Sequence, residues 1–324
     1  MSNSSLSVCM IVQNEEKYIQ KCLDSIQDVA DQIVVIDTGS EDDTIPLVKE
    51  YDTDLYHYDW KNDFSEARNY SLREASGEWI LQIDADEVLE KSEGLTSLLN
   101  NSGNDGYLVK IRNINSSQGF VKYSEDKQIR LFRNKQEYKY RNKIHEQIAP
   151  SIQNSGGKVT GSNLRIDHYG YIDKGEDKAR RNFSIMKEEV KANPRDPYLN
   201  FKLGENYKAL DNYEKSQEYL QKSIKLENFN SLPSELRSTA LMRLAQVELQ
   251  LDNYQEAANN ATKSLEIKSE NEIARFILAV SYIYLGKIQE SAQIIQKLNQ
   301  KSEVLDKSTL KEFSILIDKL QKAE

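Results

Sequence analysis

Two aspartates separated by one residue, Asp84 and Asp86, follow directly after an apolar segment at residues 79–83. That segment is predicted to be a strand, and a sharp turn after it would let both carboxylates reach the same side. Carboxylate oxygens bind Mg²⁺ or Mn²⁺, and phosphate oxygens and water can fill the remaining coordination positions. The pair is therefore a candidate site for a divalent cation on a phosphorylated substrate, although a solvated acidic turn gives the same pattern.

Polar and acidic residues also follow the three strands predicted earlier in the chain. They stand at residues 13–16, 37–40 and 63–69. Asn14 and Ser40 are expected to cap the helices that follow them, but capping does not explain why all four strand ends are polar and acidic. In an open α/β sheet the ligand binds beyond the carboxyl ends of the strands. There an acidic group can accept a hydrogen bond from uracil and an arginine can bind phosphate, so the pattern predicts a nucleotide pocket.

The elements that must position these residues can be predicted from hydrophobic spacing. The predicted strands are 6–13, 32–37, 54–58 and 79–83, and the predicted helices are 15–28, 40–51 and 64–75. Apolar strands that alternate with amphipathic helices are typical of a parallel sheet with helices on both faces. Residues 106–170 contain strand-like stretches separated by polar turns, which we expect to extend the same sheet.

From about residue 175 the chain is predicted to be helical and repetitive. Ser216, Ala257 and Ser291 close three matching segments at spacings of 41 and 34 residues. The second spacing is the tetratricopeptide period, and the first is that period with seven inserted residues. The pattern predicts a solenoid, with an unspecialised helical bundle as the alternative. The predicted repeats are about 197–230, 238–271 and 272–305, and a capping helix follows at 307–321.

Length and composition set broad limits on the class of protein. The chain has 324 residues, of which 38% are hydrophobic and 29% charged, so we expect two globular domains, residues 1–172 and 173–324. No apolar run approaches the roughly 20 residues that span a bilayer, and no signal-peptide pattern is evident, so we expect a cytoplasmic protein without membrane insertion. The net charge of −9 disfavours a nucleic-acid partner. Cys9, Cys22 and His57 are expected to be structural.

Four segments in combination resemble family 2 glycosyltransferases of the GT-A fold, over about residues 6–170. They are VCMIVQNEEKYIQKCLDSI, IVVIDTGSEDDT, WKNDFSEARNYSL and WILQIDADE. The resemblance implies an α/β GT-A domain with a Rossmann-like mixed sheet, here followed by an all-α tetratricopeptide-like solenoid. Together with the strand-end pattern it predicts a site for a nucleotide sugar. The residues expected to bind it are Val12, Asn14, Glu15, Asp37, Ser40, Asp63, Arg68, Asp84 and Ala85.

The same resemblance implies roles for two later histidine positions. His168 stands where the family carries a metal-binding histidine, so Asp86 and His168, with Asp84, are expected to hold Mg²⁺ or Mn²⁺. The family's general base is an acidic residue, often in a Glu-Asp pair, and the nearest match is His145-Glu146. This departure leaves open whether Glu146 is the base or His145 shares the task. An inverting transfer needs such a group within hydrogen-bond reach of the acceptor proton.

The domain pairing narrows the resemblance to peptide glycosyltransferases that modify glycosylated bacteriocins (glycocins). It implies inverting transfer of a hexose, typically glucose from UDP-glucose, to Cys or Ser of a small peptide, and a homodimer formed through the helical domain. A glycan or lipid-linked acceptor, or a non-catalytic adaptor, is the alternative. Residues 112–127 could form a lid over the substrates or an ordinary β-hairpin.

Overall fold

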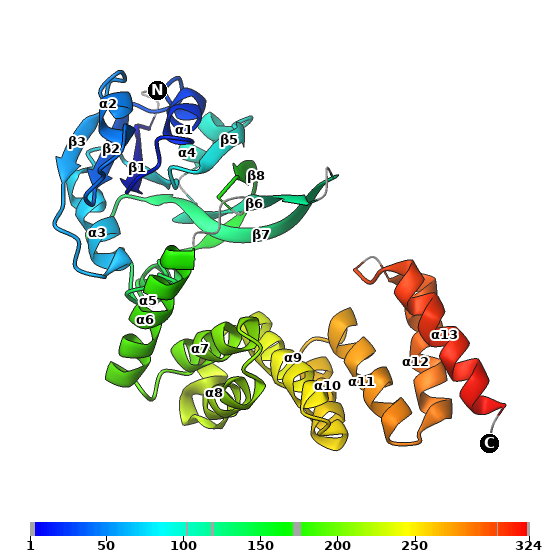
Figure 1. Cartoon of the computed structure of the whole chain (residues 1–324). Helices are drawn as coiled ribbons and strands as arrows, with labels where there is room; N and C mark the ends of the chain where they lie inside the picture. The colour runs from blue at the N-terminus through cyan, green and yellow to red at the C-terminus, as the bar shows by residue number, and fades with distance from the viewer. Residues whose placement is uncertain (1–3, 102, 118–119, 171–175, 303, 323–324) are drawn as a thin grey trace. The chain divides into compact units, whose positions relative to one another are not determined.

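The computed structural model describes residues 4–101, 103–117, 120–170, 176–302 and 304–322. The chain divides into two compact units, Met1–Ile185 and Met186–Glu324 (Figure 1). The division lies within helix α6 (Glu176–Ala192). The first unit contains the sheet and the predicted pocket residues, and the second consists of helices.

An eight-stranded mixed sheet in the order β3-β2-β1-β4-β7-β6-β8-β5 forms the first unit. Its strands are β1 (Leu6–Val12), β2 (Gln32–Asp37), β3 (Asp54–His57), β4 (Trp79–Gln82), β5 (Glu87–Lys91), β6 (Gly106–Ser117), β7 (Phe120–Arg133) and β8 (Val159–His168). The first four are parallel, as predicted. Beyond them β7 runs antiparallel to β4 and β6 antiparallel to β7, whereas β8 is parallel to β6 and β5 antiparallel to β8.

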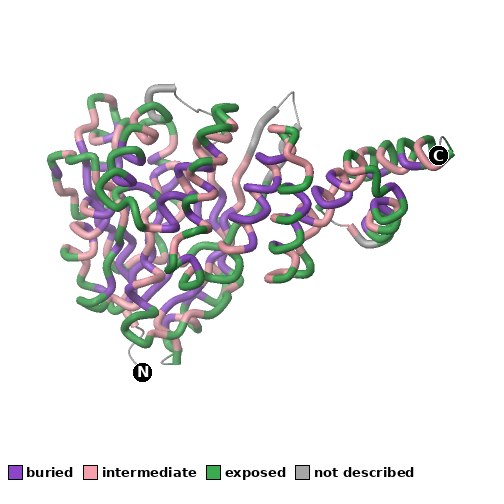
Figure 2. The backbone as a smooth tube through the Cα atoms, turned by 90° about the horizontal axis from the view of Figure 1, so that it is seen from below, coloured by how far each residue is buried: buried purple, intermediate pink, exposed green. Residues whose placement is uncertain are grey.

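Each face of the sheet has its own apolar core, because side chains of a strand alternate between faces. Along β1, Val8 and Met10 belong to the core with α1 (Ile19–Ile26), while Cys9 belongs to the core on the opposite face. The remaining helices of this unit are α2 (Thr44–Val48), α3 (Phe64–Glu74), α4 (Leu95–Leu99) and α5 (Ala149–Asn154). Figure 2 shows the buried positions of the backbone in purple. The apolar cores on both faces of the sheet confirm the predicted α/β architecture.

The candidate lid at 112–127 belongs to strands β6 and β7. These strands pair without interruption from Arg112 opposite Glu125 to Ser117 opposite Phe120. Residues 118 and 119 lie outside the described part of the chain. The described residues are therefore those of a β-hairpin, which was one of the two expectations.

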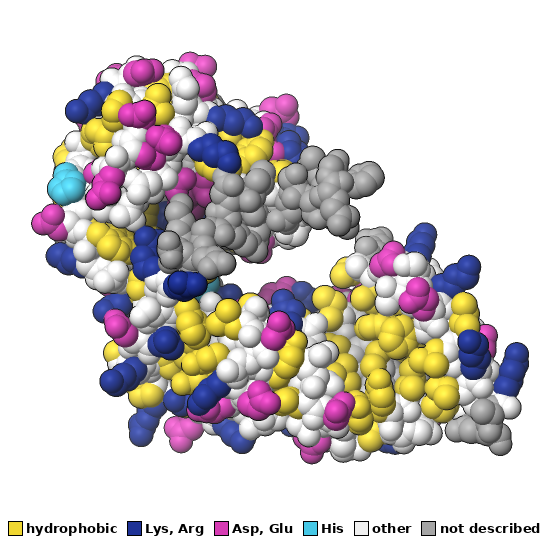
Figure 3. Space-filling view, viewed as in Figure 1, with side chains coloured by type: hydrophobic (Ala, Val, Ile, Leu, Met, Phe, Trp, Pro, Cys, Tyr) yellow, Lys and Arg dark blue, Asp and Glu magenta, His cyan; other side chains and the backbone are white. Residues whose placement is uncertain are grey.

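The second unit is built of paired antiparallel helices. They are α7 (Pro197–Ala209), α8 (Tyr213–Lys225), α9 (Ser234–Gln250), α10 (Tyr254–Ile267), α11 (Glu272–Tyr284), α12 (Ile288–Lys301) and α13 (Lys307–Gln321). A short 3₁₀ helix, η1 (Glu227–Ser231), lies between α8 and α9 and accounts for the longer first spacing of the repeats. Acidic, basic and apolar side chains are interspersed on the face of this unit seen in Figure 3.

Small residues lie where the helices of a pair cross. A Cβ on Gly204 would approach the Leu220 side chain of the next helix to 2.7 Å, so only glycine fits there. The Ser216 hydroxyl donates to the Gly204 carbonyl oxygen at 2.8 Å, and Ser291 donates to the Ala279 carbonyl oxygen at the same distance two repeats later. The repeated contact confirms that the small residues mark helix crossings, as expected of a solenoid.

Two further expectations can be compared with the structure. Cys9 and Cys22 are free thiols that are fully buried, and burial raises the pKa of Cys9 to about 12. Both are therefore structural, as predicted. None of the helices in the described ranges is long and apolar enough to cross a membrane.

Candidate active site

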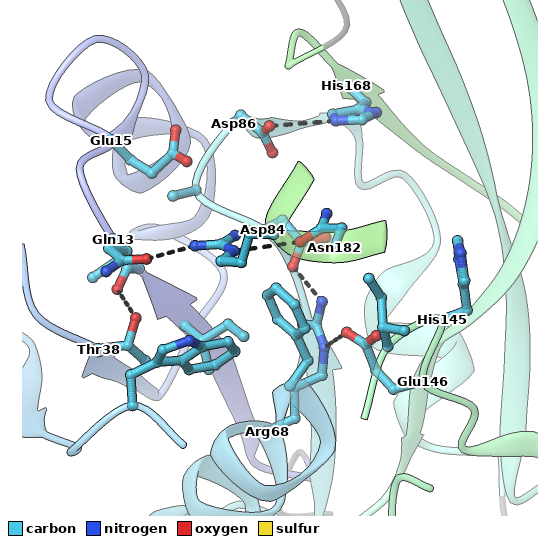
Figure 4. Close-up of a pocket in the computed structure, with 17 residues that line it drawn as sticks. Gln13, Glu15, Thr38, Arg68, Asp84, Asp86, His145, Glu146, His168 and Asn182 are labelled. Carbon is cyan, nitrogen blue, oxygen red and sulfur yellow. Dashed lines mark hydrogen bonds and ion pairs between the residues drawn. The ribbon is translucent and has the colours of Figure 1, made fainter. Parts of the chain in front are cut away.

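A pocket of about 380 Å³ lies at the carboxyl ends of β1, β2 and β4, where the sequence predicts a nucleotide site (Figure 4). Most of the predicted site residues line it, and several residues that the predictions omit do so too. The lining residues are Ile11, Val12, Gln13, Glu15, Thr38, Trp60, Phe64, Arg68, Asp84, Ala85, Asp86, Ile144, His145, Glu146, His168, Arg181 and Asn182.

Arg68 joins two of the predicted site carboxylates. Its Nε donates to Glu146 Oε1 at 2.6 Å, and its Nη2 donates to Asp84 Oδ1 at 2.8 Å. The three groups come from helix α3, the loop before α5 and the turn after β4. The Arg68 side chain is only 9% exposed, so its charge is held by these carboxylates rather than by solvent. Arg68, one of the residues predicted to bind the nucleotide sugar, thus bridges two carboxylates of the site.

Arg130 on β7 and Glu87 on β5 extend this network beneath the pocket. Arg130 Nη2 donates to Asp84 Oδ2 at 3.1 Å and to Glu87 Oε1 at 2.8 Å. Burial alone would raise the pKa of Asp84, but the guanidinium groups of Arg68 and Arg130 outweigh it and hold that pKa well below its usual range. Burial raises the pKa of Glu87, and the neighbouring Asp84 charge adds to the rise. Both oxygens of Asp84 are therefore engaged by cations.

Asp86 turns away from this network toward β8. Its Oδ2 lies 3.3 Å from His168 Nε2, and His168 Nδ1 lies 2.9 Å from Asn113 Oδ1 on β6. When Nδ1 donates to Asn113, Nε2 faces Asp86, so the protonated ring can donate Nε2–H to that carboxylate, whereas the neutral ring turns its lone pair there. Burial would lower the pKa of His168, but the Asp86 carboxylate outweighs it and raises that pKa. The predicted pair of metal ligands thus meets at one point in the pocket.

Gly170 leaves the space that this pair occupies. A Cβ at this position would lie 1.9 Å from Asp86 Oδ2 and 2.9 Å from His168 Nε2. Real Cβ atoms do not approach other atoms so closely, so glycine is required for the observed geometry. Among the described residues, no group of three or more His, Cys, Asp or Glu side chains forms a complete metal site.

The loop that carries His145 and Glu146 is closed by backbone hydrogen bonds between Arg141 and Gln147 at 3.1 and 3.0 Å. Within it, His145 has a φ of 53°. This left-handed conformation is unusual for a residue with a side chain, and such strain often lies at functional sites. Glu146 is turned inward to Arg68, while His145 is exposed at the pocket.

The predicted helix caps Asn14 and Ser40 are wrong. Helices α1 and α2 have Tyr18 and Asp43 at their N-cap positions, with no side-chain cap. Instead the Asn14 amide N–H donates to Ser40 Oγ at 3.1 Å, and Asn14 Oδ1 accepts from the Glu41 amide N–H at 2.8 Å. Both side chains therefore join the loops after β1 and β2, because those loops extend further than helical spacing indicates.

Four predicted donor-binding residues, namely Asn14, Asp37, Ser40 and Asp63, are not among the lining residues. Asp37 is buried, and its Oδ1 accepts from the Ser40 amide N–H at 2.9 Å. Asp63 caps helix α3 by accepting from the Glu66 amide N–H. These contacts hold the loops around the pocket. His57, expected to be structural, is exposed and lies 3.4 Å from Asp37.

The predicted site residues do not include Arg130, Glu87 or Arg181. Arg130 and Glu87 stand in strands whose place in the sheet depends on tertiary pairing, and no motif marks them. Arg181 reaches the pocket from α6, which follows the last strand. Trp60 precedes the DFSEARN segment (residues 63–69) and Phe64 lies within it, so both could have been found from that motif.

Two regions of the chain match models of known protein families. Residues 7–154 match the family model described as glycosyl transferase family 2, and residues 198–270 match that of the tetratricopeptide repeat. The first match contains the residues of the Arg68 network, and the second falls in the helical unit. The chain therefore carries a family 2 glycosyltransferase domain followed by tetratricopeptide repeats.

Two curated proteins and one solved structure are similar to this chain. A TPR repeat-containing protein of Synechococcus elongatus is 32% identical over 68% of this chain and 57% of its own length. The SPbeta prophage-derived glycosyltransferase SunS of Bacillus subtilis is 32% identical over 66% of this chain and 52% of its own length. The chain spans about half the length of these curated relatives. The solved structure of S. aureus TarS has a TM-score of 0.46 at 18% identity, over 78% of this chain and 54% of that one.

The Arg68 bridge predicts a large loss of stability when its charge is removed. Arg68→Met would leave Glu146 and part of the Asp84 charge without compensation, so we expect the free energy of unfolding to fall by about 3–5 kcal/mol. Unfolding can be followed by tryptophan fluorescence, because the two tryptophans of the chain, Trp60 and Trp79, both lie in the first unit.

The matched control is Arg73→Met, which removes the same charge from an exposed position of the same helix. Its effect should stay within about 0.5 kcal/mol. Equal stability of the two variants would show that the bridge does not stabilise the fold.

Proposed function

We propose that this chain is an inverting, metal-dependent glycosyltransferase that moves a hexose, glucose, from a UDP-sugar to Cys or Ser of a small peptide, as in the maturation of a bacteriocin precursor. The observation that carries the proposal is the pocket of the family 2 domain, which brings together the Asp86–His168 pair and Glu146. A cation ligand set and a candidate base in one pocket are what glycosyl transfer from a nucleoside diphosphate requires.

The donor site is assigned to the loops after β1, β2 and β4. Val12, Glu15 and Ala85 line the pocket there, and Asp37, Ser40 and Asn14 hold the loops in place. Backbone and carboxylate oxygens at this edge can accept hydrogen bonds from the uracil ring. The donor would thus lie across the strand ends.

The residues present fit a divalent cation. Asp86 Oδ2 and His168 Nε2 are 3.3 Å apart, Gly170 leaves them room, and Asn113 can fix the histidine tautomer that ligates through Nε2. Diphosphate oxygens and water would complete the coordination of Mg²⁺ or Mn²⁺, as is usual when a protein supplies few ligands. The cation would neutralise the charge that develops on the departing UDP. Asp84 contributes by holding the turn through its arginine partners.

Glu146 and His145 remain the two candidates for the base. Arg68 fixes one oxygen of Glu146, so the carboxylate has a set orientation in the pocket. His145 stands beside it on the strained loop. Either group can take the proton of an acceptor thiol or hydroxyl as the acceptor attacks the anomeric carbon from the face opposite UDP. A thiol needs this help less, because its pKa is nearer neutral.

The repeats and the resemblance to glycocin-modifying enzymes support a peptide acceptor. Tetratricopeptide solenoids present extended surfaces suited to peptides. A second candidate is a glycan acceptor, which is favoured by the 34% identity over 50% of this chain to the lipopolysaccharide core biosynthesis glycosyltransferase LpsC of Rhizobium meliloti. A homodimer through the helical unit remains a prediction.

The proposal is tested by UDP release from a panel of UDP-sugars, with Mn²⁺, Mg²⁺ or EDTA, and with or without Cys- and Ser-containing peptides. We expect metal-dependent release from one donor and a gain of one hexose in peptide mass. Asp86→Ala and Glu146→Gln should each lower transfer to Ser by about 100-fold or more. Glu137→Gln, at an exposed position, is the matched control.

The outcomes separate the alternatives. Transfer to Cys that survives in Glu146→Gln while transfer to Ser is lost would support Glu146 as the base. Near-normal transfer to both would assign the base to His145. Donor hydrolysis without peptide modification would favour a glycan acceptor, and no nucleotide-sugar binding by folded protein would contradict the proposal.

Gly170→Ala should abolish the metal-dependent part of UDP affinity, because the added Cβ occupies the space between Asp86 and His168. The matched control is Gly161→Ala on β8, where a Cβ would meet no atom within 4 Å. Both variants are titrated with UDP in Mn²⁺ and in EDTA. If UDP affinity depends on Mn²⁺ as much in Gly170→Ala as in the wild type, the cation binds elsewhere.

A further inference from the structure

The pocket is poor in available positive charge. Among its described lining residues the carboxylates are Glu15, Asp84, Asp86 and Glu146. Arg68 also lines it, but the guanidinium is occupied by Asp84 and Glu146. A diphosphate entering the pocket would therefore meet several negative groups, and the Arg68 charge is already compensated.

Arg181 differs from Arg68 in its surroundings. It reaches the pocket from α6, and its Nη1 donates to Gln13 Oε1 at 3.0 Å. Its guanidinium carbon lies 5.8 Å from the Trp60 ring centroid and 5.6 Å from that of Phe64. These partners are neutral, and within the described ranges Arg181 has no carboxylate in ion-pair distance. Burial accordingly lowers the pKa of Arg181, with no offset from a charged group in the described part of the chain.

A partly buried cation without a counter-charge is costly to maintain, so an anion in the pocket would relieve that cost. The aromatic rings support the flat face of the guanidinium. Its Nε also donates to Asn182 Oδ1, at 3.4 Å. Phosphate oxygens would therefore be bound through Nη2, and through Nη1 or Nε in exchange for a neutral amide oxygen; such forked contacts are ones that Arg makes better than Lys. Gln13, directly after β1, fixes the guanidinium beside the strand ends where the donor is assigned.

We propose that Arg181 binds the diphosphate of the nucleotide-sugar donor, so that α6 completes a donor site whose other groups come from the sheet. The inference rests on the proposed function. It adds a binding residue outside the matched family domain, which ends at residue 154. Together with the divalent cation, Arg181 would offset the charge of UDP against the surrounding carboxylates.

The test measures the affinity of the full chain for UDP and for uridine, in Mn²⁺, with uridine measured by competition. Arg181→Gln should weaken UDP binding by about 10-fold or more, the value of one charge-assisted phosphate contact, and change uridine binding by less than about twofold. Arg181→Lys should lose less than Arg181→Gln, because it keeps the charge without the fork. Arg195→Gln, an exposed position, is the matched control.

Three outcomes would overturn the inference. Equal UDP affinity of the wild type and Arg181→Gln would exclude the contact. A higher KM for the acceptor peptide in Arg181→Gln, with unchanged UDP affinity, would assign Arg181 to the acceptor. Equal losses of uridine and UDP affinity would mean that Arg181 holds the pocket's shape through Gln13. Absence of nucleotide binding by the wild type would instead contradict the proposed function.

Discussion

The bridge from Arg68 to Asp84 and Glu146 is the interaction on which the rest of the pocket depends. It ties helix α3, the turn after β4 and the loop before α5 to a single buried guanidinium. Charges withdrawn from water are stable only when they are compensated. The bridge therefore holds the three segments together at the pocket.

The mixed half of the sheet brings a second group to the same turn. Asp84 is hydrogen-bonded to Arg68 and Arg130. Asp86 points to the other side of the turn, toward His168. His168 reaches it because β8 pairs with both β6 and β5, and β5 follows directly after the turn. The parallel strands thus supply the donor edge, and the added strands bring the histidine to it.

Apolar runs predict β1, β2 and β4 well, because each of these strands is buried on both faces. The edge strand β3 is only partly buried, and its place follows from the helices that precede and follow it. The small residues at helix crossings likewise predict the paired helices, since Gly204 is required by the Leu220 contact. The first loops are not predictable in this way. Asn14 and Ser40 have the residue types of helix caps but join one loop to the other.

Some residues of the site can likewise be predicted from the sequence, and others cannot. Asp86 and His168 can be predicted from motif and family resemblance, and the structure places them together. Arg130 and Arg181 cannot, because tertiary placement of a strand brings Arg130 beneath the pocket and tertiary placement of a helix brings Arg181 into its lining, with no local pattern to mark either. Ion pairing between residues far apart in sequence leaves no periodic signal. It also changes the meaning of a motif, since the first aspartate of Asp84-Ala85-Asp86 serves the fold through its arginines.

The central claim is that Asp86 and His168 form half of a cation site that the donor diphosphate completes. The most direct measurement is the affinity of the full chain for Mn²⁺, with and without UDP, in the wild type and Asp86→Ala. The account predicts that UDP strengthens Mn²⁺ binding by about 10-fold or more in the wild type only, with an equal effect of Mn²⁺ on UDP. Equal Mn²⁺ affinity with and without UDP would contradict it.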